Sequence, residues 1–270
     1  MAFVCTWTLR FLPKEPVTSM QKSHLVKVFD PLPYGLRRAC FRTLFQSRFK
    51  RLLACRDPKV KEGFQLSGLD DTRSMFIHVP KCGGRSIAKA LYKDEHVGHA
   101  THRQYRILFS EEEYRSYYKF AIVRNPWDRL VSAFHYLKGG GNGPADRLWA
   151  DENLKPFEDF DTFVREWLPG KKLNSIYWHF MTQTHFTHTE SGTNELDFIG
   201  HFETLEDDYN TIAKRLGIET RLPVINTSKR RTDFRSYYTD NTAEIAAKSY
   251  QVDIDAFGYR FDDVARDQKA

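Results

Sequence analysis

Residues 75–92 read MFIHVPKCGGRSIAKALY, and this stretch decides the fold. The opening MFIHV is typical of a buried strand, and the residues from Arg85 onward have the spacing of a helix. Between them, Gly83 and Gly84 let the backbone approach a ligand closely, and the amides at a helix start carry partial positive charge. Lys81 adds a full charge beside them. The stretch therefore predicts a strand, a phosphate-binding turn and a helix, in that order.

The order of charges in this turn differs from that of ATP-binding loops. The Walker sequence GxxxxGK[ST] places its lysine after the glycines. Here Pro80-Lys81 precedes the glycines and Arg85-Ser86 follows them. This inversion favours a phosphate site other than that of an ATPase.

The composition is that of one globular domain. The chain has 270 residues, of which 41% are hydrophobic and 28% are charged, so it is long enough for one sizeable core. The net charge of +6 belongs to the N-terminal quarter, because residues 1–74 hold fourteen Lys or Arg against six Asp or Glu. A nucleic-acid-binding face would be expected to extend over the whole domain. We therefore expect no nucleic-acid partner.

The cysteines and the first residues of the sequence indicate the cellular compartment of the protein. No CxxC pair or metal-ligand spacing with histidine is present among the cysteines, which are Cys5, Cys40, Cys55 and Cys82, so we expect no metal site and no disulfide framework. Arg10, Pro13 and Lys14 interrupt the opening segment well short of the ~18 to 20 apolar residues that a membrane span needs. No signal peptide is convincing. These features predict a cytoplasmic protein.

Residues 34–56 are expected to form a basic amphipathic helix. Apolar side chains recur there at helical spacing, and seven basic residues share the segment: Arg37, Arg38, Arg42, Arg48, Lys50, Arg51 and Arg56. One interpretation is peripheral contact with an anionic membrane surface or a polyanion. The other is packing of the apolar stripe on the main domain. The pattern leaves both open.

Beyond Asp70 strands and helices alternate. We expect strands at 75–79 and 119–123, followed by helices from about 85 and over 127–137, and then helices near 157–167, 174–180, 203–216 and 242–250. The alternation predicts an α/β fold with a central, mostly parallel sheet flanked by helices. Glycines at 139–143 predict a flexible loop that could close over the site. We divide the chain into a basic N-terminal extension, 1–73, and one domain, 74–270.

A second strand-to-helix unit, residues 120–132, reads FAIVRNPWDRLVS. It puts Arg124 at the carboxyl end of a strand, where parallel sheets bind ligands. Ser132 lies eight residues on, about two turns into a helix that starts near Pro126. Arg124 would serve either an anion site or an internal ion pair with an aspartate. Spacing alone does not decide between them.

Together the two units resemble the sulfotransferase superfamily, in the carbohydrate-type branch (family 2) that includes heparan sulfate 2-O-sulfotransferase and many bacterial relatives. PKCGGRS is similar to that family's 5′-phosphosulfate loop, and VRNPWDRLVSAF is similar to its 3′-phosphate motif, with Arg124 and Ser132 at the matching positions. The resemblance covers residues of about 74 to 262. It implies a P-loop-like three-layer fold.

The resemblance also implies a donor, 3′-phosphoadenosine 5′-phosphosulfate (PAPS), whose sulfuryl group passes in line to an acceptor hydroxyl on a carbohydrate or polysaccharide. Sulfuryl transfer needs a cation on the leaving phosphate and hydrogen-bond donors around the equatorial oxygens, as phosphoryl transfer does. Lys81 would supply that cation, so no metal is required. The donor-binding residues implied by the resemblance are Lys81, Cys82, Gly83, Gly84, Arg85, Ser86, Arg124, Ser132, Lys229 and Arg230.

Arg85 departs from the family pattern, which commonly has threonine at this position. Its guanidinium would either reach the phosphosulfate or point to an acidic acceptor or to solvent. The acceptor hydroxyl also needs a base, and histidine titrates near neutrality. Gly98-His99 aligns with the Gly-His that carries the catalytic base of heparan sulfate 2-O-sulfotransferase. The resemblance thus implies that His99 is the base, with His102 as the second candidate.

Two other classes of function compete with this interpretation. A P-loop kinase would use the same strand, turn and helix, but it should carry lysine after the glycines and a magnesium-binding aspartate at a strand end. A non-catalytic polyanion-binding module would account for the basic N-terminal segment. Acceptor contacts are weakly indicated, in a segment that resembles the family's acceptor side and contains Trp178, His179, Gln183 and His185. Oligomeric state is not indicated.

Overall fold

The computed structural model describes residues 32–60, 64–93, 97–189, 191–223, 225 and 233–263. Its sheet contains β1 (Ser74–Ile77), β2 (Tyr118–Val123) and β3 (Phe198–His201). The three strands are parallel and lie in the order β1-β2-β3. Strands β1 and β2 are buried along almost their whole length, as expected for a parallel sheet covered on both faces. The α/β class with a parallel sheet is therefore confirmed.

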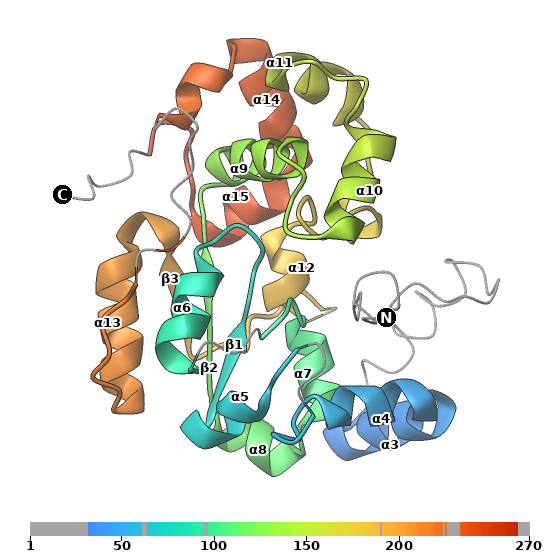
Figure 1. Ribbon diagram of the computed structural model, residues 1–270, viewed down its shortest axis with the longest axis vertical. Helices are drawn as coiled ribbons and strands as arrows, with labels where there is room; N and C mark the ends of the chain where they lie inside the picture. Colours follow the sequence, from blue (N-terminus) through green and yellow to red (C-terminus); the bar gives the residue numbers. More distant parts are fainter. Residues whose placement is uncertain are drawn as a thin grey trace.

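Helices cover both sides of the sheet. In Figure 1, α6 (Gly84–Leu91) and α13 (Leu205–Leu216) lie on one side, and α7 (His102–Leu108) and α12 (Gln183–Thr187) lie on the other. Two short helices, α5 (Ser67–Thr72) and α8 (Glu111–Ser116), each precede a strand. This is the flanked sheet that the alternation of strands and helices predicts.

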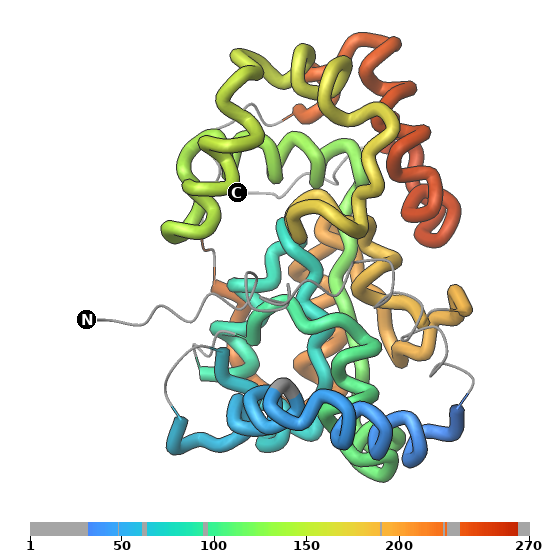
Figure 2. Tube along the Cα trace, turned by 90° about the vertical axis from the view of Figure 1, so that its right-hand side faces the viewer, coloured from blue at the N-terminus to red at the C-terminus, as the bar shows by residue number. Residues whose placement is uncertain are grey.

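A second group of helices stands beyond the carboxyl ends of the strands. It contains α9 (Pro126–Lys138), α10 (Pro144–Asn153), α11 (Phe160–Thr162), a π-helix (Phe163–Trp167), α14 (Asp240–Ser249) and α15 (Gln251–Phe257). Short 3₁₀ helices occur at Leu173–Ser175, Phe202–Thr204 and Phe234–Tyr237. Figures 1 and 2 place α9, α10 and α14 at one end of the molecule and the first two described helices at the other.

Each end has its own apolar core. One cluster surrounds the sheet and contains Phe76 and Phe120, and the other surrounds α9 and contains Phe134 and Phe163. Cys82 of the phosphate turn belongs to the first cluster, whereas Val123, which precedes Arg124, belongs to the second. The two expected ligand-binding segments therefore lie where the two cores meet.

The segment 34–56 forms two helices instead of the single one expected. α3 (Tyr34–Leu44) and α4 (Gln46–Ala54) are separated by Phe45, whose φ of −127° and ψ of 43° are not helical. Tyr34, Leu52 and Cys55 are buried in the cluster around the sheet, and the Tyr34 hydroxyl donates to the Phe109 carbonyl at 3.2 Å. Part of the apolar stripe therefore packs on the domain, as one of the two alternatives has it.

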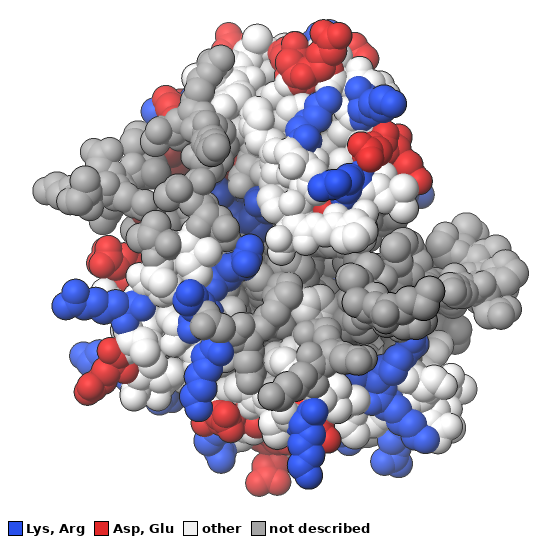
Figure 3. Space-filling view, viewed as in Figure 1, with Lys and Arg blue, Asp and Glu red and all other residues white. Residues whose placement is uncertain are grey.

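The outer surface of α3 and α4 keeps the features that suggested a membrane contact. Leu36 and Leu44 are 51% and 60% exposed. In Figure 3, Lys and Arg side chains lie over the lower right of the face, where Figure 1 places these helices. Peripheral membrane contact stays a prediction, as does the division at residue 73. Within the described part of the chain, no helix is long and apolar enough to cross a membrane.

The prediction of a helix over 174–180 is wrong beyond Ser175. The chain there forms one 3₁₀ turn and then successive turns. The Asn174 side chain accepts hydrogen bonds from both the amide and the hydroxyl of Thr182, each at 3.0 Å. Such a bond from a side chain to the backbone competes with helix continuation. The sequence gave no sign of this contact.

Two buried histidines should make the stability of the fold depend on pH. Burial lowers the pKa of His102 to about 4, although the charge of Glu195 opposes the shift, and burial lowers the pKa of His185 to about 4. The unfolded chain, with histidine near 6.5, binds more protons, so the free energy of unfolding should fall as the pH drops from about 6.5 to about 4. The loss should reach roughly 3 kcal/mol per histidine. Urea unfolding across this range measures it.

His185→Gln provides the comparison. This variant should lose one of the two contributions, so its free energy of unfolding should decline less steeply between pH 6.5 and 4 than that of the wild type. Above pH 7 the two curves should run parallel, because the histidines are neutral in both states. Equal slopes in the acidic range would contradict the assignment.

Candidate functional site

The turn between β1 and α6 has the geometry of an anion cradle. Lys81 and Gly83 both have positive φ, 68° and 74°, which is unusual for a lysine and typical of functional turns. The amides of Ser86 and Ile87 donate to the Gly83 carbonyl at 3.0 and 3.4 Å and begin helix α6. The amides before them have no acceptor within the helix. These amides and the helix dipole suit a phosphate or sulfate group.

Close packing requires both glycines. A Cβ atom on Gly84 would lie 2.0 Å from Cδ2 of His78, whose ring is 4% exposed and stacks on Phe76. A Cβ atom on Gly83 would lie 2.8 Å from Leu205 at the start of α13. The turn therefore packs against His78, which follows β1, on one side and against α13 on the other, and this packing holds its backbone in place.

The other side chains of the turn differ in exposure. The Cys82 thiol is buried and lies 3.4 Å from the amide oxygen of Gln183. Burial raises its pKa to about 12, so the thiol stays protonated and packs inside the domain under the turn. Ser86 is also buried, whereas Arg85 is exposed at the first turn of α6. Lys81 and Arg85 are thus the charged side chains of this turn that solvent reaches.

Arg124 joins the second motif to this turn. Its Nε and Nη2 atoms contact a carboxylate oxygen of Asp128 at 2.8 and 2.7 Å, and its Nη1 donates to the Lys81 carbonyl at 2.9 Å. The guanidinium also lies 3.9 Å from the centre of the Phe202 ring, which follows β3. The internal ion pair that spacing left open is thus present. The same cation stands against the backbone of the phosphate turn.

One face of α9 lines the site. Asp128, Ser132 and Tyr136 are four residues apart, so they share this face. Asp128 pairs with Arg124, and the Lys81 ammonium lies 3.7 Å from the centre of the Tyr136 ring. Ser132, which is half-buried, lies between these two contacts along the helix. The structure therefore brings Lys81 and Arg124 together, and helix periodicity puts Ser132 on the face of α9 that contacts both.

His99 lies beside the turn through His78. Its Nδ1 is 2.9 Å from the His78 carbonyl oxygen, and the two imidazole rings are 4.2 Å apart. Because a carbonyl can only accept, Nδ1 carries the hydrogen and Nε2 carries the lone pair. His99 is half-buried. In the neutral form of His99, Nε2 is therefore the nitrogen able to take a proton.

His179 extends this group toward α9. Its ring lies 6.3 Å from that of His99 and 5.0 Å from that of Tyr136. Burial, together with the charges of His99 and Lys81, lowers its pKa well below the usual histidine value. His179 is therefore neutral near pH 7. The sequence placed His179 near an acceptor but gave no sign of its contact with Tyr136.

Arg129 is a second arginine of the α9 motif that sequence reasoning missed. It is 1% exposed, and it donates to the carbonyls of Pro80 at 2.9 Å and Met181 at 2.8 Å. These bonds tie the phosphate turn to the chain that carries His179. Its place inside the quoted motif was the available signal. A buried arginine here adds positive charge behind the turn.

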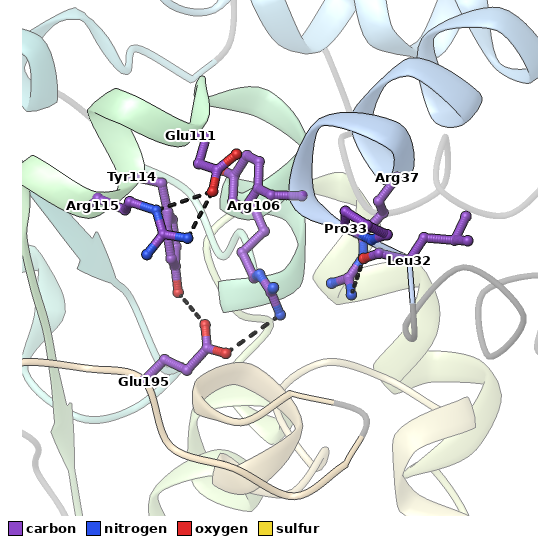
Figure 4. Close-up of a pocket in the computed structure, with 9 residues that line it drawn as sticks. Leu32, Pro33, Arg37, Arg106, Glu111, Tyr114, Arg115 and Glu195 are labelled. Atoms are coloured by element: carbon purple, nitrogen blue, oxygen red, sulfur yellow. Dashed lines mark hydrogen bonds and ion pairs between the residues drawn. The ribbon is translucent and has the colours of Figure 1, made fainter.

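His102, the second candidate base, lies elsewhere. It is 1% exposed, its Nε2 contacts the Tyr114 hydroxyl, and it lies 3.6 Å from Glu195. Tyr114 and Glu195 precede β2 and β3, so His102 sits toward the amino ends of the strands. Figure 4 shows these neighbours lining a cavity of about 430 Å³, in which Glu195 faces Tyr114 and Arg106.

The remaining residues predicted from the sequence are either outside the described ranges or have a structural role. Lys229 and Arg230 lie outside the described residues. Gln183 is fully buried, and its amide bonds both the amide and the carbonyl of Arg124, at 2.9 and 2.7 Å. It therefore supports the strand end structurally. Within the described ranges, no group of three or more His, Cys, Asp or Glu side chains could hold a metal ion.

Gly84→Ala tests the close packing of the turn. The new methyl group would overlap the His78 ring, and overpacking of a buried site costs typically 1–3 kcal/mol. We expect the free energy of unfolding in urea to fall by about that amount. Gly35→Ala on α3 is the control, because a Cβ there meets nothing within 4 Å. Equal stabilities of the two variants would show that His78 yields easily.

Comparison with known proteins gives one family. A model of the sulfotransferase family matches residues 69–260. Carbohydrate sulfotransferase 10 of Gallus gallus is 28% identical over 188 residues, covering 57% of this chain and 51% of the relative. Carbohydrate sulfotransferase 11 of Rattus norvegicus is 28% identical over 171 residues, covering 56% and 49%. The chain spans about half the length of the curated relatives it matches. No solved structure matches significantly.

Proposed function

The chain belongs to the sulfotransferase family, and from this we propose that it transfers a sulfuryl group from PAPS to a hydroxyl group of a carbohydrate. The observation that carries the proposal is the hydrogen bond from Arg124 to the Lys81 carbonyl. It joins the two motifs at one edge of the sheet, where parallel sheets bind ligands. The carbohydrate acceptor is supported by the names of the relatives, which are carbohydrate sulfotransferases.

The donor fits the turn with its two phosphates apart. The amides of Gly83 to Ser86 hold the 5′-phosphosulfate, and Arg124 with Ser132 holds the 3′-phosphate. Arg124 has five N–H donors, and three of these contact Asp128 and Lys81. The others can meet a phosphate without breaking the ion pair. Lys229 and Arg230 complete this phosphate site in the proposal, by family resemblance.

The transfer itself needs a base and a leaving-group cation. His99 takes the acceptor proton on Nε2 while the acceptor oxygen forms its bond to sulfur. The bond from sulfur to the bridging oxygen breaks, and its electron pair passes to the 5′-phosphate of the departing bisphosphate. The Lys81 ammonium neutralises the charge that develops on that oxygen. The neutral state of His179 keeps a further positive charge away from the imidazolium of His99.

Calorimetric titration tests the donor. 3′-Phosphoadenosine 5′-phosphate should bind, and ATP should bind much more weakly. Arg124→Ala should weaken the binding of the bisphosphate by roughly 10- to 100-fold, because a charge-assisted hydrogen bond contributes about 1.5–3 kcal/mol. Arg165→Ala is the control, since it removes another arginine–aspartate pair at i,i+4, one that is exposed to solvent. Tight binding of ATP without binding of the bisphosphate would favour a kinase. If neither the bisphosphate nor ATP binds, the result would favour a non-catalytic polyanion-binding module.

His99→Ala tests the base. With PAPS and a responsive glycan, kcat should fall by about 10² or more, because general base catalysis contributes 10²–10⁴-fold. The affinity for the bisphosphate should be unchanged. His188→Ala is a suitable control, because this histidine packs on Phe257, outside the group around the phosphate turn. A near-normal rate in His99→Ala would exclude His99 as the base.

A further inference from the structure

The Lys81 side chain rests on an aromatic ring. Its ammonium lies 3.7 Å from the centre of the Tyr136 ring, a distance at which the ring attracts a cation. The backbone of Lys81 is already fixed, because its φ is 68° and its carbonyl accepts from Arg124. The position of the ammonium therefore depends on the flexible part of the side chain, and the Tyr136 ring is a contact at its end.

Asp146 holds Tyr136 in place. This aspartate is 7% exposed, and one of its oxygens accepts from the Tyr136 hydroxyl at 2.8 Å and from the Asn142 amide at 2.9 Å. Its other oxygen accepts from the Tyr177 hydroxyl. Burial and the hydrogen bond to Asp146 raise the pKa of Tyr136 above its usual value. The phenol thus stays protonated, and its bond to a carboxylate makes the ring face more negative.

The glycine-rich turn packs on the same aspartate. Gly141 has a φ of 62°, and a Cβ there would lie 2.2 Å from the Cβ of Asp146. The amide of Gly141 also donates to the carbonyl of Tyr136 at 3.0 Å. Residues 139–143, for which the composition predicts a flexible loop, form a turn that packs against Asp146 beside Tyr136.

We propose that Tyr136 and Asp146 are positioning residues that hold the Lys81 ammonium at the mouth of the phosphate turn. The inference rests on the proposed function, because the donor's bridging oxygen is what Lys81 is held ready to meet. Tyr136 contacts the lysine and not the donor, so it acts on turnover more than on donor affinity. Asp146 acts one step further back, by orienting the ring.

A double-mutant cycle tests the coupling. Tyr136→Leu should lower kcat by roughly 3- to 30-fold, the range that a cation–π contact supplies, with bisphosphate affinity unchanged. Tyr136→Phe keeps the ring and should lose less. In a Lys81→Ala background, Tyr136→Leu should cause no further loss, because its partner is gone. Losses that multiply in the double variant would overturn the proposal, since Tyr136 would then act independently, for example through His179.

Tyr118→Leu is the matched control. The Tyr118 ring also lies near an arginine, Arg215, at 5.5 Å, but it is at the amino end of β2, away from the site. We expect its kcat to equal that of the wild type. Circular dichroism and the urea midpoint establish that each variant is folded, and Tyr136→Phe with Asp146→Asn supply the series if Tyr136→Leu does not fold.

A second measurement does not need sulfuryl transfer. Trace acetylation with acetic anhydride, read by mass spectrometry of the peptide containing Lys81, reports how accessible and reactive its amine is. Tyr136→Leu should raise the labelling of Lys81 several-fold relative to Lys89, whereas Tyr136→Phe should not. Unchanged labelling in Tyr136→Leu overturns the proposal. Increased labelling in a protein that binds no bisphosphate would uphold the contact and reject the proposed function.

Discussion

The contact between Arg124 and the Lys81 carbonyl is the interaction on which the site depends. It connects the turn after β1 to the end of β2, two segments that lie more than forty residues apart in the chain. The two segments lie close together because both follow strands of a parallel sheet, and the carboxyl ends of parallel strands share one edge. Asp128 then holds the guanidinium from α9 at 2.7 Å. A strand end, a helix face and a phosphate turn are thereby set in one orientation.

The same arrangement explains the charge balance of the site. Two buried arginines and Lys81 lie around a turn whose amides already favour anions, so bringing these positive charges together costs free energy. The protein limits this cost by pairing Arg124 with Asp128, by placing Lys81 over an aromatic ring, and by keeping His179 neutral.

The sequence predicted the parts of this site that are local in the chain. Lys81 and the glycines follow from one strand-turn-helix pattern, and Arg124 with Ser132 follows from a second. His99 came from family resemblance, since spacing alone did not separate it from His102. Their environments do: His102 is buried against Tyr114, whereas the half-buried His99 lies beside the phosphate turn. Burial of this kind depends on tertiary packing, which spacing does not report.

The contacts that the sequence did not predict are those between side chains far apart in the chain. Nothing in the local pattern of Asp146 indicates that its carboxylate joins Tyr136 to Tyr177. The glycine-rich turn illustrates the same limit, because its composition suggests mobility while its packing against Asp146 requires a glycine with positive φ at Gly141. Glycine permits both outcomes, and the neighbouring side chain decides between them.

A buried carboxylate near the end of the domain extends this argument to the C-terminal helices. Asp253 of α15 is fully buried and accepts from the backbone amides of Gln183 and Thr184 at 2.7 and 2.9 Å. Gln183 in turn bonds the backbone of Arg124 on both sides. Burial raises the pKa of Asp253. A buried polar group that loses its hydrogen-bond partner destabilises the fold by more than the hydrogen bond itself contributes. The position of Arg124 therefore depends on a helix 130 residues downstream, so the site cannot be separated from the C-terminal end of its domain.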